Sequence, residues 1–156
     1  MANTQAMCTS FKTELLTGLH AFTTTVTRGT TAADTFKAAL YLTTASVDAN
    51  STAYTATGEA SGTNYTAGGV AVTNATAPAN WPVSASTGQA YWTPSANIAW
   101  TTVTLATNVN AVMLYNNAQS NRAVSVHTFS NQTVTAGNFT LTMPTNSNTA
   151  ALIRIA

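Results

Sequence analysis

Short segments in which apolar and polar residues alternate recur along most of the chain, and they constrain its fold more than any other feature. The segments are FKAALYL, NIAWTTVTLA, VNAVMLYN, RAVSVHTF, NFTLTM and AALIRIA, separated by turns rich in Asn, Ser and Gly. Threonine, about a fifth of all residues, is β-branched and suits such extended segments. Because no helical pattern lies between them, we predict a mainly β fold, an antiparallel β-sandwich or jelly roll in a single domain covering residues 1–156.

Helical periodicity is confined to the N-terminal part. In CTSFKTELLTGLHAF, apolar residues follow one another at steps of three or four, which predicts one short helix over about residues 10–22. Residues 1–22 would form an N-terminal arm or helix. Its apolar stripe either packs on its own domain or contacts a partner, and the candidate contact residues are Phe11, Leu15, Leu16 and Leu19.

Residues 74–97 carry three of the four prolines, Pro78, Pro82 and Pro94. Proline removes a donor from a β-ladder, so this span is predicted to be a long surface loop. Trp81, Tyr91 and Trp92 fall within it. Aromatic rings there could stack on sugar rings, or they could pack as loop anchors and core residues.

The stretch SGTNYTAGG, residues 61–69, holds a cluster of glycines that raises the question of phosphate binding. It lacks the GxxxxGK[ST] and GxGxxG patterns, and no lysine follows Lys37. We therefore predict a structural turn in which positive φ angles at Gly62, Gly68 and Gly69 reverse the chain on both sides of Tyr65.

Charge is scarce and scattered. Charged residues make up 6% of the chain, against about 25% in a typical globular protein, and the net charge is +1. Nucleic-acid binding needs clustered Lys and Arg, so we expect no nucleic-acid partner. There is no secretion leader and no apolar run of about 18 residues, so we expect neither standard secretion nor a membrane span.

Residues that could perform chemistry are few. The four acidic residues are far apart in the sequence, and the chain has one cysteine, Cys8, and two histidines, His20 and His127. Ser125 and His127 share one face of a predicted strand, but no carboxylate is near them in the sequence to complete a triad. We predict no catalytic residue, no cofactor and no metal site, and therefore a protein that is not an enzyme.

The order of the motifs FKTELL, DTFKAALY, EASGTNYTAGG, IAWTTVTL, AVMLYN, AVSVHTF, NFTLTMP and ALIRIA spans nearly the whole chain and resembles a group of small tailed-bacteriophage virion structural proteins. The resemblance implies a virion component, assembled in the cytoplasm of the host bacterium, with no catalytic residues. We expect a capsid decoration or cement protein that binds the major capsid protein and identical subunits, with a homotrimer as the candidate oligomer. A tail, neck or fibre-associated subunit is the alternative, and a carbohydrate-binding adhesin is a second one.

Overall fold

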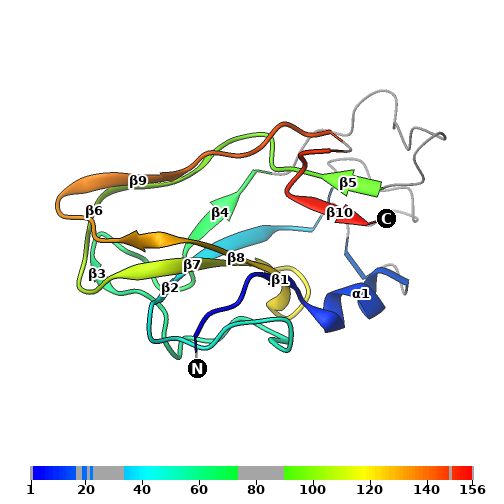
Figure 1. Ribbon diagram of the computed structural model, residues 1–156, viewed down its shortest axis with the longest axis horizontal. Helices are drawn as coiled ribbons and strands as arrows, with labels where there is room; N and C mark the ends of the chain where they lie inside the picture. The colour runs from blue at the N-terminus through cyan, green and yellow to red at the C-terminus, as the bar shows by residue number, and fades with distance from the viewer. Residues whose placement is uncertain are drawn as a thin grey trace.

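The computed structural model describes residues 2–16, 19–20, 22, 34–73, 90–147 and 149–155. Strands are the main secondary structure of these residues, and one short helix lies near the N-terminus (Figure 1). The elements are β1 (Ala6–Met7), α1 (Thr9–Leu16), β2 (Phe36–Leu42), β3 (Gly62–Thr63), β4 (Val70–Val72), β5 (Ala90–Trp92), β6 (Ile98–Leu105), β7 (Val109–Asn116), β8 (Arg122–Gln132), β9 (Gly137–Leu141) and β10 (Ile153–Ile155). The predicted mainly β fold with one short N-terminal helix is confirmed.

The strands form antiparallel sheets. The largest has the order β1-β8-β7-β2-β4, a second has the order β3-β6-β9, and β10 pairs with β5. All of the alternating segments of the sequence form strands. Four strands of two or three residues each, β1, β3, β4 and β5, were not predicted, because alternation cannot be recognised over so short a span.

The central strands β2 and β7 are buried on both faces, which makes the molecule more than a two-layer sandwich. On one face, Val112 and Leu114 meet Ile98 of β6 across a small cavity. On the other face, Tyr115 stacks on Tyr54, with ring centroids 4.9 Å apart. Figure 1 shows β6 and β9 on one side of the large sheet and the segment before β3, together with α1, on the other.

The helix ends earlier than predicted. It covers Thr9–Leu16, whereas its apolar periodicity continues to Phe22. The N–H of Leu19 donates to the carbonyl of Glu14 over 3.0 Å, a wide turn that closes the helix instead of extending it. Phe22 still contacts the ring of Phe11, with ring centroids 5.7 Å apart. The helical spacing of these two apolar residues therefore results from a contact between them and not from a continuous helix.

The N-terminal segment packs on its own domain, and Phe11 is wrong as a residue of a contact arm. β1 pairs with β8, and the N–H of Thr4 donates to Val47 O over 3.0 Å. Phe11 is 0% exposed, so this candidate contact residue packs in the chain's own core and is not available to a partner. Leu15 and Leu19 are half-buried, and the side chain of Leu16 lies outside the described part of the structure.

The predicted surface loop over residues 74–97 is wrong at its C-terminal end. Ala90–Trp92 is strand β5, which pairs with β10, while residues 74–89 and Trp81 lie outside the described residues. Trp92 is 7% exposed, and its indole N–H donates to the carbonyl of Phe22 over 3.0 Å. Trp92 therefore anchors the C-terminal strand pair on the core and offers no face to a sugar.

Candidate functional site

The glycine-rich stretch forms the turns that its glycines predict. Gly62, Gly68 and Gly69 have φ values of 144°, 85° and 70°. A Cβ atom on Gly69 would lie 1.8 Å from the carbonyl oxygen of Ala38, so the backbone of β2 approaches this residue too closely for any side chain. The turn is therefore built against β2.

The turn is fixed by the carboxylate of Glu59. It accepts hydrogen bonds from the phenol of Tyr54 over 2.6 Å, the phenol of Tyr65 over 2.9 Å and the N–H of Gly68 over 2.8 Å. The phenol of Tyr115 donates to the Gly68 carbonyl over 2.7 Å. Burial raises the pKa of Tyr54 and of Tyr115 to about 12, so both remain protonated donors at neutral pH. Glu59, engaged by three donors, is a structural centre and not a free base.

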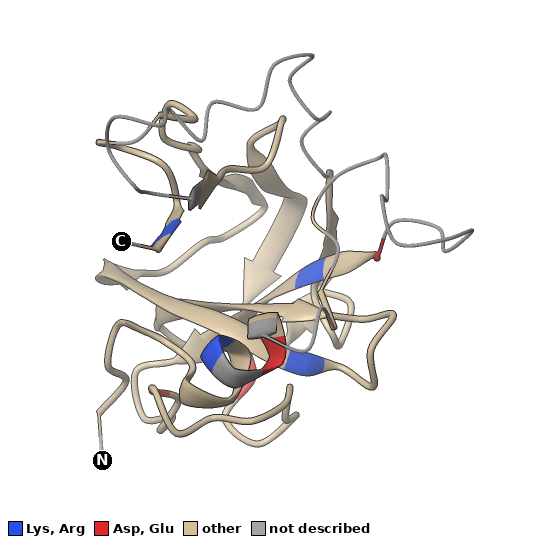
Figure 2. Cartoon of the chain, turned by 90° about the vertical axis from the view of Figure 1, so that its right-hand side faces the viewer, with Lys and Arg blue, Asp and Glu red and all other residues tan. Residues whose placement is uncertain are grey.

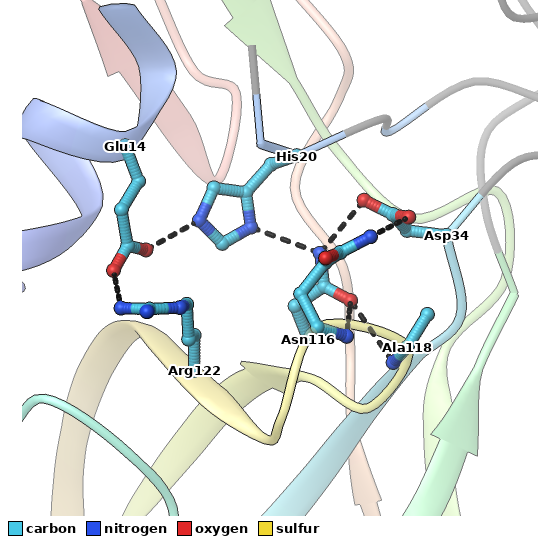
Figure 3. A network of polar contacts seen from close by, with 7 residues as sticks. Glu14, His20, Asp34, Asn116, Ala118 and Arg122 are labelled. Atoms are coloured by element: carbon cyan, nitrogen blue, oxygen red, sulfur yellow. Dashed lines mark hydrogen bonds and ion pairs between the residues drawn. The ribbon is translucent and has the colours of Figure 1, made fainter. Parts of the chain in front are cut away.

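A second polar network lies beside α1 (Figure 3). The Nε2 atom of His20 is 2.7 Å from Glu14 Oε2, and its Nδ1 atom is 2.9 Å from Nδ2 of Asn116. Nδ2 of Asn116 also donates to Asp34 over 2.8 Å, and Arg122 forms an ion pair with the other oxygen of Glu14. The network joins the helix, the segment before β2 and the ends of β7 and β8 at their connecting turn.

The orientation of each group in this network is determined by its neighbours. Oδ1 of Asn116 accepts the N–H groups of Ala118 and Gln119, over 3.1 and 3.2 Å, so its amide NH₂ must face His20 and Asp34. His20 therefore accepts at Nδ1 and donates at Nε2, which is the neutral form. Burial lowers the pKa of His20, although the hydrogen bond to Glu14 acts in the opposite direction. Neither ring nitrogen of His20 is free to exchange a proton with a substrate.

The other histidine lies at a surface hollow of about 620 Å³. Ser125 Oγ and His127 Nε2 lie 2.9 Å apart, so the structure brings together the pair noted in the sequence. The walls of the hollow are residues 5–7 on one side and, on the other, Pro144 and residues 150–154. These two walls are far apart in the sequence, and no sequence motif signals the hollow.

The Ser125–His127 pair lacks the features of a nucleophile and its base. Ser125 is 2% exposed, and burial lowers the pKa of His127 to about 4, which makes it a weak base at neutral pH. The Nε2 atom of His127 contacts the Ser125 hydroxyl, and among the described residues no carboxylate forms a hydrogen bond with the ring. Burial also raises the pKa of the Cys8 thiol to about 11, so this cysteine is not activated either.

Each of the four acidic residues of the chain already has an internal partner. Glu14 and Asp34 belong to the histidine network, Glu59 holds the glycine turn, and Asp48 accepts the N–H of Asn50 over 2.8 Å. Within the described residues there is no group of three His, Cys, Asp or Glu side chains that could hold a metal ion. Nor does any helix in this part of the chain have the length and hydropathy of a membrane span.

The surface has little charge and few large apolar side chains. Figure 2 shows few Lys, Arg, Asp and Glu residues on the chain, and several of them gather at α1, where Glu14 and Arg122 form an ion pair. Ile155, 40% exposed, is the single exposed large hydrophobic residue among those that the structure describes. Comparisons of the chain with protein-family models, with curated proteins and with solved structures found no match.

Proposed function

We propose that this chain is a non-enzymatic structural protein of a tailed-bacteriophage virion, and specifically a capsid decoration protein that binds the shell formed by the major capsid protein. The order of sequence motifs, which resembles small virion structural proteins, supports the class. The observation in the structure that carries the proposal is the engagement of three of the four carboxylates, those of Glu14, Asp34 and Glu59, in contacts that hold the fold together, while the fourth, Asp48, accepts the N–H of Asn50 in a local turn.

The use of these carboxylates favours a scaffold over a catalyst. Acid–base and nucleophilic mechanisms need a carboxylate or a histidine that can reach a substrate. Here Glu14, Asp34 and Glu59 link segments that are distant in the sequence, and His20 is held at both ring nitrogens. The same contacts tie α1, the glycine turn and the β7–β8 turn to the large sheet, as a rigid subunit requires.

Decoration stabilises a shell by mass action. A protein that binds the assembled lattice, and not its free subunits, shifts the equilibrium towards the lattice. A charge-poor surface suits this role, because identical neighbours at high copy number then do not repel one another.

The number of copies per particle tests the proposal. Virions of the phage that encodes this chain would be purified, and its ratio to the major capsid protein measured by quantitative mass spectrometry. We expect a fixed number of copies per particle, of the same order as the number of copies of the major capsid protein. A ratio of only a few copies per particle would indicate the tail, neck or fibre alternative, and absence from virions would overturn the virion proposal altogether.

Addition of the protein to shells that lack it tests the mechanism. Purified wild-type chain should raise the temperature at which the empty shells disassemble, up to a saturating ratio. Heat-denatured wild-type chain is the matched control, because it has the same composition without the folded surface and should leave the disassembly temperature unchanged.

A further inference from the structure

We propose that the apolar cavity between the two sheets is a binding site for a small, uncharged apolar molecule about the size of benzene. The inference does not rest on the virion proposal, since its evidence is the volume of the cavity and the chemistry of its lining.

The cavity has a volume of about 160 Å³ and lies between the large sheet and the sheet of β3, β6 and β9. Its floor consists of Ile98 of β6 and of Val112 and Leu114 of β7, all of which are buried. Core side chains interdigitate, so voids larger than a water molecule are few in a domain. A space of this size is larger than the gaps of ordinary close packing.

The other apolar side chains around the cavity form a rim that gives access to it. Phe129, Leu141, Met143 and Leu152 line the cavity and are half-buried, so each is in contact with solvent on one side. Met143 and Leu152 lie outside the strands, and the unbranched side chain of a methionine adapts its shape easily. A small molecule can therefore enter through movement of side chains, without separation of the sheets.

The polar residues of the lining favour an apolar ligand over water or an ion. The Nε2 atom of His127 is 2.9 Å from Ser125 Oγ, and the hydroxyl of Thr128 donates to Gln5 Oε1 over 3.3 Å. The third polar residue, Thr142, is exposed. An ordered water needs about two to four polar partners, and the cavity offers too few. Among the described residues that line the cavity, only His127 titrates, and burial lowers its pKa to about 4, so the lining is uncharged at neutral pH.

The volume and the lining together determine the class of ligand. An engineered apolar cavity of about 150 Å³, lined by Leu, Ile and Phe, stays dry and binds benzene or xenon. The cavity between the two sheets has nearly the same volume, and Leu, Ile and Phe are the main residue types around it. A charged molecule of similar size would lose its hydration there without gaining a partner. The ligand class is therefore a compact, uncharged apolar molecule of about six carbon atoms.

Titration of the full chain with benzene tests the proposal, with ¹³C-labelled methyl groups as the NMR readout. We expect saturable shifts at the methyl groups of Ile98, Val112 and Leu114, and a dissociation constant on the order of 1 mM, as a ligand of this size allows. The methyl groups of Val70 on β4, which does not line the cavity, should stay unshifted. Benzoate is the matched charged probe and should bind about tenfold more weakly or not at all. Saturating benzene should also raise the melting temperature, because it binds the folded state.

Variants that fill the cavity supply the second arm. Val112→Ile and Leu141→Phe each add carbon atoms to the lining, whereas Val70→Ile adds the same methyl group at a half-buried position outside it. Both filling variants should bind benzene about tenfold more weakly at a melting temperature close to that of the wild type, and Val70→Ile should keep the wild-type affinity. Leu141 lies on the half-buried rim, so Leu141→Phe remains informative where Val112→Ile overpacks the core.

Three results would overturn the proposal. The first is the absence of saturable shifts at the methyl groups of the floor up to the solubility limit of benzene, or shifts of equal size at Val70. The second is binding of benzoate with the affinity of benzene. The third is wild-type affinity for benzene in both filling variants.

Discussion

The phenol of Tyr65 donates to the carboxylate of Glu59 over 2.9 Å and accepts the backbone N–H of Leu40 over 3.0 Å. One side-chain oxygen therefore joins the glycine turn to the central strand β2. Leu40 is fully buried, so its N–H has no access to water if the phenol is removed. The stretch SGTNYTAGG thus contributes to stability through its tyrosine as well as its glycines.

Replacement of Tyr65 by Phe should lower the free energy of unfolding by about 2 kcal/mol, because it leaves a buried N–H and a carboxylate oxygen without this partner. The matched control is Tyr54→Phe, which removes another donor to Glu59 but leaves the N–H of Leu40 paired with Tyr65, and should cost about 1 kcal/mol. Urea denaturation of both variants measures the difference. A loss for Tyr54→Phe equal to or larger than that for Tyr65→Phe would contradict this order.

Replacement of Gly69 by Val should lower the free energy of unfolding by about 3 kcal/mol or more. The residue has a φ of 70°, and its Cβ would meet the Ala38 carbonyl at 1.8 Å. Gly137→Ala is the control, since its Cβ would lie 3.4 Å from Val134 Cγ1 and its change should stay under about 1 kcal/mol. If Gly69→Val kept the wild-type melting temperature and lost binding to shells, the turn would be a contact surface instead.

Phe11→Ala should lower the free energy of unfolding by about 4 kcal/mol, as truncation of a buried aromatic side chain does. Leu15→Ala, on the half-buried side of the same helix, should cost clearly less. Thermal melts of the free protein distinguish a core residue from a contact arm. A Phe11→Ala variant with the wild-type melting temperature would restore the arm interpretation.

The long strands could be predicted from the sequence because each is long enough to show alternation. The end of the helix could not, since Phe11 and Phe22 contact each other and keep a helical spacing after the helix has ended at Leu16. Strand β5 could not either, because the pairing of Trp92 with Ile153 is a tertiary contact.

The site depends even more on contacts between residues that are far apart in the sequence. Glu14 pairs with Arg122 across 108 positions, and Asn116 bonds to Asp34 across 82. Neither partner lies within a recognisable motif, so sequence reasoning missed both. The Glu59–Tyr65 contact spans only six positions, and the local stretch was sufficient to suggest a turn there.

The stability of the protein should fall as the pH drops from about 6.5 towards 4. Burial lowers the pKa of His127 to about 4 in the folded state, whereas an unperturbed histidine has a pKa of about 6.5. The unfolded chain therefore takes up a proton first as the pH falls, and the free energy of unfolding decreases by up to about 3 kcal/mol over this window. Burial lowers the pKa of His20 as well, so it acts in the same direction.

Melting temperatures measured from pH 7 to pH 4 test this dependence. His127→Gln keeps a polar side chain beside Ser125 and removes the titrating group, so its melting temperature should fall less steeply than that of the wild type. His20→Gln should also reduce the slope, but it breaks contacts to Glu14 and Asn116 and should lower stability at pH 7 too. NMR titration of the His127 ring identifies the group directly, and a ring that titrates at its ordinary pKa of about 6.5 would refute the assignment.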